Sequence, residues 1–105
     1  MNTPHHQLFG LPESVVEKIR IVFQKHPDIQ RVLLYGSRAK GNYQLGSDID
    51  LCLEAEKFTL TQLLKVNNEL DDLLLPWKVD LSLKHDIDNQ TLLDHISEVG
   101  IVFYP

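Results

Sequence analysis

Two acidic residues follow a Gly-Ser pair at a short spacing, and this arrangement is the strongest chemical feature of the chain. Ten residues separate Gly36-Ser37 from Asp48, and Asp50 comes two positions later. A Gly-Ser turn leaves backbone N–H groups free to face an anion. Side chains alternate along a strand, so Asp48 and Asp50 share a face with their Cα atoms about 6.5–7 Å apart. Because two carboxylates that close repel each other unless a cation lies between them, the pattern indicates a nucleotide beside a divalent metal ion, and hence phosphoryl or nucleotidyl transfer.

A third acidic residue can complete the metal site. Asp80 lies in an alternating segment, residues 78–83, thirty positions after Asp50. If this strand lies beside the one that carries Asp48 and Asp50, three carboxylates converge on one edge of a sheet. Such a set can hold two Mg²⁺ ions about 3.5–4 Å apart, one at the attacking oxygen and one at the triphosphate. Oxygen ligands favour Mg²⁺, with Mn²⁺ as a substitute, over Zn²⁺.

The loop after the Gly-Ser pair supplies candidate phosphate ligands. Ser37 offers its hydroxyl and its backbone N–H to the β- and γ-phosphates. Arg38 and Lys40 can neutralise the charge that grows on the leaving pyrophosphate. The structural alternative is that Arg38 and Lys40 are solvated loop charges.

Composition restricts the class of protein. The chain has 105 residues, which is one small domain with a single core. Ten Lys and Arg against fifteen Asp and Glu give a net charge of −5, so a nucleic-acid partner is disfavoured, because binding to it depends on cationic contacts with phosphates. One cysteine, Cys52, excludes an internal disulfide, and no leader or membrane-length apolar run is evident. We expect a cytoplasmic protein with no membrane association.

The elements that position the site alternate between helix and strand. We expect helices from about residue 11 to 25, 59 to 75 and 89 to 98, and strands over 30–35, 48–53 and 78–83, with a loop over 36–47. Residues 101–104 are expected to be a short terminal strand or an extended tail. Residues 1–10 are expected to be a flexible N-terminal segment, and 11–105 a single domain. Interleaved helices and strands predict an α/β or α+β fold with helices packed on a sheet.

The motif resembles the signature of the DNA polymerase beta superfamily of nucleotidyltransferases. Residues 36–41 and 47–51, together with Asp80 in its strand, carry the likeness, and the short chain is similar to the minimal nucleotidyltransferases. The resemblance implies a mixed β-sheet flanked by helices and two Mg²⁺ held by Asp48, Asp50 and Asp80. It also implies nucleotide binding by the residues Gly36, Ser37, Arg38, Lys40 and Ser47, and transfer of a nucleotide, usually AMP from ATP. Position 45 is Leu where relatives often have proline, which affects the rigidity of the loop.

Minimal members of this superfamily are often encoded beside a small all-helical protein of the HEPN type. The resemblance therefore implies an antitoxin role, with AMP transferred to the protein partner. Two alternatives stay open: a nucleotide-binding module that neutralises or stabilises a helical partner without turnover, and a transferase for a small molecule such as an aminoglycoside. A hetero-oligomer is expected, and a homodimer is the other possibility.

The second expected helix points to a protein partner independently of the family. Its apolar residues spread over about 200° of the helix, more than the stripe of about 100° that packing on one sheet requires. Part of that surface is therefore expected to contact another protein. The alternative is a helix wedged between the sheet and the loops.

Overall fold

The computed structural model describes residues 7–105, and its centre is a four-stranded sheet in the order β5-β4-β3-β6. These strands are β3 (Arg31–Tyr35), β4 (Ile49–Glu54), β5 (Val79–Leu83) and β6 (Ile101–Tyr104). Strands β4 and β5 run parallel, whereas β3 is antiparallel to both β4 and β6. The expected mixed sheet is therefore confirmed.

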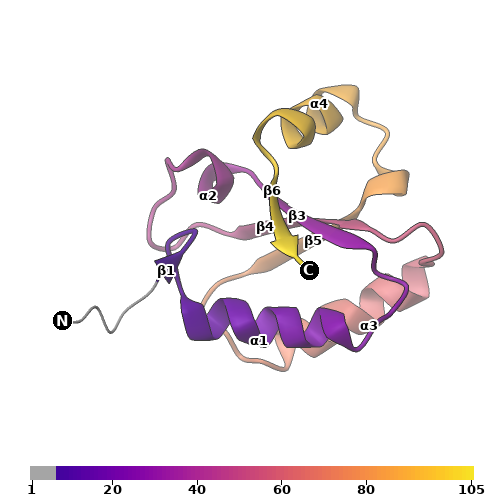
Figure 1. The fold of residues 1–105 in the computed structure, drawn as a ribbon, viewed down its shortest axis with the longest axis horizontal. Helices are drawn as coiled ribbons and strands as arrows, with labels where there is room; N and C mark the ends of the chain where they lie inside the picture. Colours follow the sequence, from indigo (N-terminus) through magenta and orange to yellow (C-terminus); the bar gives the residue numbers. More distant parts are fainter. Residues whose placement is uncertain (1–6) are drawn as a thin grey trace.

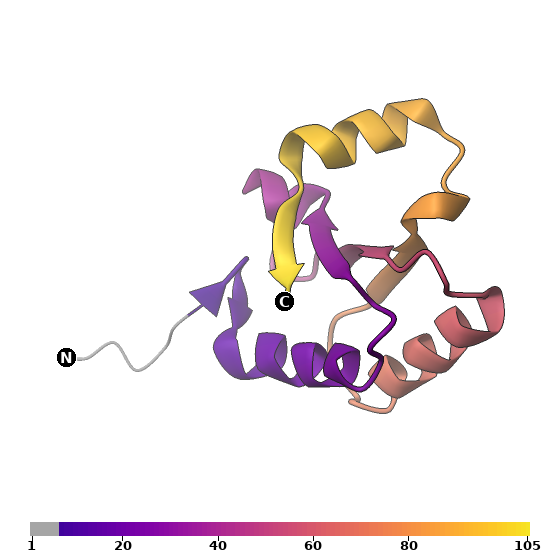
Figure 2. The ribbon, with the colours of Figure 1, turned by 45° about the vertical axis from the view of Figure 1, so that its right-hand side comes forward.

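Helices cover both faces of the sheet. Helices α1 (Glu13–Gln24) and α3 (Leu60–Asp71) lie along one face, and α4 (Gln90–Val99) lies on the other (Figure 1). The turned view separates the two layers clearly, with α4 above the strands and α1 and α3 below them (Figure 2). The main core lies under α1 and α3, and a smaller cluster, Leu33, Tyr35, Cys52 and Ile96, lies under α4. The strand residues thus divide between two cores according to the two-residue alternation of a strand.

Local sequence explains where α3 and α4 begin. Thr59 forms a capping box with Gln62, in which the Gln62 N–H donates to the Thr59 hydroxyl and the Thr59 N–H donates to the Gln62 carboxamide. Asn89 accepts a hydrogen bond from the N–H of Leu92 at the start of α4. Each cap satisfies an N–H group that the first helical turn leaves without a partner.

Helix α3 ends earlier than the sequence predicts. The expected helix ran to residue 75, but the helix stops at Asp71. Leu74 has a φ of 53°, which a helix cannot contain, and its side chain is 87% exposed. Leu73 and Leu75 instead pack against the main core from an irregular segment. Leu73, Leu74 and Leu75, which were expected to belong to the wide apolar face of this helix, are therefore not helical. The exposed leucines of α3 itself are Leu60 and Leu64.

Residues 7–12 form a short hairpin ahead of α1. Strand β1 (Gln7–Leu8) pairs with β2 (Leu11–Pro12), so α1 begins at Glu13 and not at residue 11. The Phe9 ring lies 5.7 Å from the Phe103 ring, which anchors this hairpin on the core. The rest of the expected flexible segment, residues 1–6, lies outside the described residues.

Two short helical turns complete the chain. The expected loop over 36–47 begins with a single helical turn, α2 (Ser37–Lys40), and η1 (Lys84–Asp86) follows β5. Among residues 7–105 we find no helix with the length and apolar character needed to cross a membrane.

Candidate functional site

Three strands place two acidic residues and a tyrosine in one row across the sheet. Tyr35 on β3 is the register partner of Asp50 on β4, and Asp50 is the register partner of Asp80 on β5. The expectation that the strand of Asp80 lies beside the strand of Asp50 is therefore confirmed. Asp48 lies just before β4, at the same end of the sheet. Directly paired residues on parallel strands point to the same face, so this end of the sheet concentrates negative charge.

The concentration of negative charge affects the pKa of Asp50. Burial raises the pKa of the Asp50 carboxyl group above its usual value, and the nearby Asp80 and Asp48 carboxylates raise this pKa further. Burial also raises the pKa of the Tyr35 hydroxyl, with Asp50 and Asp80 contributing in the same direction. A carboxylate that is destabilised by two others is a group that a bound cation would stabilise.

The Gly36 backbone lies directly against Asp50. Gly36 has φ 75° and ψ −155°, a conformation that is essentially restricted to glycine. A Cβ atom added at this position would lie 2.3 Å from the Asp50 Oδ2 atom. Two independent features therefore require glycine at position 36: the backbone conformation and the close approach of the Asp50 carboxylate.

His95 takes part in the site, although the sequence offered no metal or catalytic pattern for it. Its Nε2 atom accepts a hydrogen bond of 3.1 Å from the Gly36 N–H, and its ring meets the Tyr35 ring edge-on at 6.1 Å. His95 comes from α4, fifty-nine residues away from Gly36. The one available signal was its place on the helix face that carries Leu92 and Ile96. An anion at this turn would compete with His95 for the Gly36 N–H.

The remaining predicted phosphate ligands differ in their surroundings. Ser37 begins α2 beside Gly36, and its hydroxyl makes no hydrogen bond with the described part of the chain. The Lys40 side chain is exposed at the end of the same turn. The Ser47 hydroxyl accepts a hydrogen bond of 2.8 Å from the N–H of Gln44, which closes the loop in front of Asp48. Ser37 and Lys40 are thus available to a ligand, while Ser47 already holds the loop.

Arg38 occupies a structural position rather than the open one that its predicted role requires. Its side chain is buried, with 2% exposure. The guanidinium group donates to the carbonyl oxygens of Phe9, Leu45 and Ser47 at 2.9–3.2 Å. It also lies 5.1 Å from the centre of the Tyr43 ring. Because these contacts use both ends of the planar group, Arg38 ties the N-terminal hairpin to the loop in this structure.

The donor set fits a hard divalent cation, although it is not closed around one. No three His, Cys, Asp or Glu side chains in residues 7–105 converge closely enough to form a metal site as they stand. Asp48 and Asp80 are exposed and Asp50 is half-buried, so the carboxylates face open space. Their oxygen donors and mutual repulsion suit Mg²⁺. The residues that would hold it are Asp48, Asp50 and Asp80.

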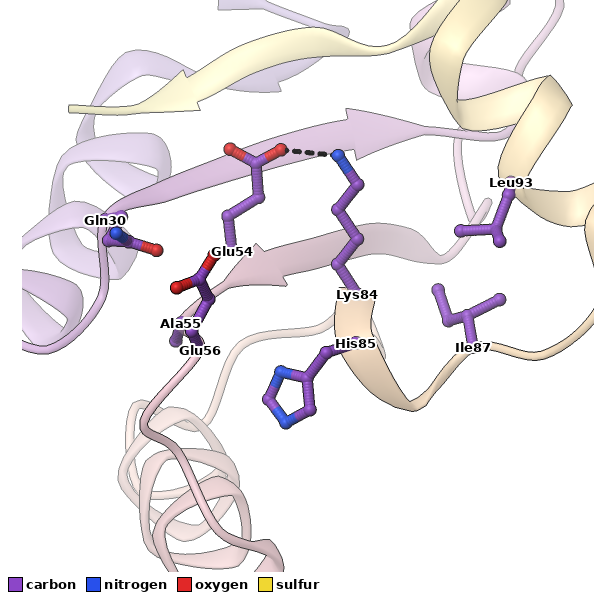
Figure 3. A pocket seen from close by; sticks show the side chains of 8 residues that line it. All are labelled: Gln30, Glu54, Ala55, Glu56, Lys84, His85, Ile87 and Leu93. Carbon is purple, nitrogen blue, oxygen red and sulfur yellow. Dashed lines mark hydrogen bonds and ion pairs between the residues drawn. The ribbon is translucent and has the colours of Figure 1, made fainter.

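The opposite end of the sheet carries a different charge arrangement. Glu54 accepts hydrogen bonds from Arg31 and from Lys84, and the Arg31 and Lys84 side chains hold the pKa of Glu54 down at about 2. A cavity of about 540 Å³ opens beside Glu54 and Lys84, and His85 and Leu93 also line it (Figure 3). None of the three aspartates lines this cavity. We therefore place the candidate site at the Gly36 end of the sheet.

A mixed sheet with a Gly-Ser turn beside carboxylates on two neighbouring parallel strands defines a nucleotidyltransferase-like domain. Residues 17–105 match the family described as polymerase beta, nucleotidyltransferase. The match spans most of the sequence, and the chain belongs to this family.

Solved structures with the same fold come from toxin–antitoxin complexes. A toxin–antitoxin structure with AMP-PNP has a TM-score of 0.69 and 22% identity, over 84% of this chain and 71% of that chain. A complex of a tri-AMPylated Shewanella oneidensis HEPN toxin with an MNT antitoxin has a TM-score of 0.64 and 19% identity, over 87% and 70%. A MntA-HepT toxin–antitoxin structure gives the same values. No curated protein sequence matches the chain.

Proposed function

We propose that this chain is a Mg²⁺-dependent nucleotidyltransferase that transfers AMP from ATP to a hydroxyl group of a helical HEPN-type partner protein. The pairing of Asp50 with Asp80, next to the Gly36 turn, is the observation that carries the proposal. The similar structures support the choice of nucleotide and partner, since one contains AMP-PNP and another a tri-AMPylated HEPN toxin. In this role the chain is the antitoxin of a toxin–antitoxin pair.

The reaction is a displacement at the α-phosphorus. The acceptor oxygen forms a bond to the α-phosphorus, the bond from that phosphorus to the bridging oxygen breaks, and pyrophosphate leaves. Mg²⁺ held by Asp48, Asp50 and Asp80 would supply charge stabilisation for the triphosphate. Ser37 binds phosphate oxygens, and the Gly36 N–H joins it where the phosphate displaces His95 from that N–H. Lys40 offsets the charge on pyrophosphate, and Asp80, on the edge strand, accepts the acceptor's proton.

Label transfer from ATP tests this proposal. The chain is purified with the HEPN-type protein encoded beside it and incubated with Mg²⁺ and ATP labelled at the α-phosphate. We expect label on the partner, and its loss with EDTA, with Asp50→Asn and with Asp80→Asn. Glu56→Gln is the matched control, because Glu56 is an exposed carboxylate beyond the far end of β4.

Two results would contradict the proposed mechanism or the transfer itself, and a third would contradict the protein acceptor. Undiminished labelling by Asp50→Asn would remove the carboxylates from the mechanism. Tight binding of Mg²⁺, nucleotide and partner without any label would favour the non-catalytic module. Labelling of an aminoglycoside, with none on protein, would favour the small-molecule enzyme.

A further inference from the structure

Strand β5 is an edge of the sheet, and its outer side is open. It pairs with β4 on one side, and no other strand of residues 7–105 pairs with it. An unpaired edge presents a row of backbone N–H and C=O groups that another extended chain can bind. This edge also carries Asp80, so it adjoins the candidate site.

The ladder geometry identifies the outward groups. The N–H of Ile49 donates to the carbonyl of Lys78 at 2.8 Å. In a parallel ladder the residues of a strand bond alternately to one side and the other, so Lys78, Asp80 and Ser82 bond toward β4. The N–H and C=O groups of Val79 and Leu81 therefore face away from β4. Within the described residues neither takes part in a backbone hydrogen bond outside the sheet.

A groove follows this edge. It has a volume of about 370 Å³ and runs between α3 and β5. Its lining consists of consecutive residues 78–81 on the strand, and Leu63, Leu64, Asn67 and Asp71 on the helix side. Leu64 is 54% exposed. The groove therefore combines the strand with a wall that is apolar at Leu63 and Leu64 and polar at Asn67 and Asp71, and Asp80 is part of its lining.

The other edge of the sheet is less open than β5. On β6 the carbonyl of Phe103 already accepts a hydrogen bond of 2.8 Å from Arg20 of α1. The pairing of β6 with β3 is also irregular between Val32 and Leu33. Bulges and side-chain caps of this kind discourage the addition of a strand. The open edge is thus the one at the site.

We propose that an extended segment of the acceptor protein, outside its helices, binds as an added strand along the outer edge of β5, with its acceptor hydroxyl on the Asp80 face. This inference rests on the proposed transfer of AMP to a protein. Neighbouring strands lie about 4.8 Å apart, which brings a residue opposite Asp80 next to its carboxylate. Because side chains alternate, the residues flanking the acceptor residue point into the groove against Leu64, so we expect apolar residues there.

The lysines at the ends of β5 favour a partner over a second copy of this chain. Lys78 precedes the strand and Lys84 follows it. Antiparallel pairing of two β5 strands centred on Leu81 would place Lys78 of one copy opposite Lys84 of the other. Like charges directly opposite each other are destabilising. A different polypeptide avoids that repulsion.

Two variants block the edge without adding charge at the site. Val79→Pro removes an N–H that faces away from β4, a position where an edge strand tolerates proline. Leu64→Trp fills the groove with a bulky neutral side chain. Leu60→Trp is the matched control, because Leu60 is an exposed leucine one turn away on α3 that does not line the groove.

The test uses the wild-type complex and these variants with the HEPN-type partner. Calorimetry and label transfer should show affinity for the partner weakened by about fivefold to tenfold in Val79→Pro and Leu64→Trp, the scale of one or two lost interactions. The affinity of both variants for Mg²⁺ with the ATP analogue AMP-PNP should stay within about twofold of the wild-type value. Leu60→Trp should stay within about twofold of wild type in both assays. Amide exchange by NMR should show Val79 and Leu81 becoming protected on partner binding.

Each outcome decides between the two proposals. Protection of Val79 and Leu81 with weakened variants supports strand addition, and it does so even if no label is transferred, in which case the transferase alone fails. Label transfer with unprotected amides and unaffected variants overturns strand addition and leaves the transferase standing. If no label is transferred and neither amide becomes protected, both proposals are overturned.

Discussion

Replacement of Gly36 by alanine should destabilise the fold through two separable costs. The first is backbone strain, because φ 75° with ψ −155° is a region that side chains avoid, and it costs about 1–3 kcal/mol. The second is the contact at 2.3 Å between the new Cβ and the Asp50 Oδ2 atom, which forces Asp50 from its rotamer at about 0.5–1.5 kcal/mol. We expect a total loss of about 1.5–4.5 kcal/mol, measured as the free energy of unfolding in urea.

A double-mutant cycle separates these costs. In an Asp50→Ala background the nearest remaining Asp50 atom, Cβ, lies 3.5 Å from the new Cβ, which is ordinary contact. Gly36→Ala should therefore cost about 0.5–1.5 kcal/mol less there than in the wild-type chain. Gly41→Ala is the matched control, because Gly41 has φ 87° and no atom within 4 Å of an added Cβ. It should show backbone strain without coupling to Asp50.

The reasoning fails if Gly36→Ala is neutral. It also fails if the cost is the same with and without the Asp50 carboxylate, since the carboxylate would then not define the turn. Equal coupling of Gly41→Ala to Asp50 would show that the coupling reflects a general change of the loop.

Three further substitutions test the charges of the site and the sheet. Arg38→Lys should cost about 2–3 kcal/mol in urea unfolding, because a lysine cannot reach the separate carbonyls that the buried guanidinium joins; a neutral result would remove Arg38 from loop anchoring. Asp50→Asn should be more stable than the wild-type chain at neutral pH. The pKa of Asp50 is raised above 3.8 in the folded state, so the wild-type chain loses stability as pH rises from 3.8 through the folded-state pKa. The difference in melting temperature between the two proteins should therefore widen as pH rises, and a constant difference would contradict this reasoning. Glu54→Gln should show the opposite pH dependence. The stabilisation by Glu54, about 1 kcal/mol after screening because Arg31 and Lys84 are half exposed, is present above pH 4.5 and is lost as pH falls toward about 2, so an acid titration of stability should show the two proteins converge.

The pattern that defines the candidate site is local in the sequence. Alternation along a strand predicts that Asp48 and Asp50 share a face, although β4 begins at Ile49 and Asp48 lies just before it. The alternating segment around Asp80 identifies a second strand, which the structure confirms as β5. The helix caps at Thr59 and Asn89 are likewise local, since they involve residues three positions apart. The sequence therefore predicted a nucleotidyltransferase-like sheet whose acidic residues gather at one end.

The partners of Gly36 and Arg38 were decided by tertiary structure alone. His95 reaches the Gly36 N–H only because α4 packs over the end of β3, and no local pattern links residues so far apart. Arg38 could face a phosphate or the protein interior until the hairpin of residues 7–12 placed the Phe9 carbonyl beside it. The end of α3 at Asp71 depends in the same way on the packing of Leu73 and Leu75 against the core, which outweighs a helical propensity that continues to Pro76. Sequence thus determined the periodic elements and the faces on which their side chains lie. The contacts between distant elements, and the open edge beside Asp80, follow from the spatial order of the strands in the sheet.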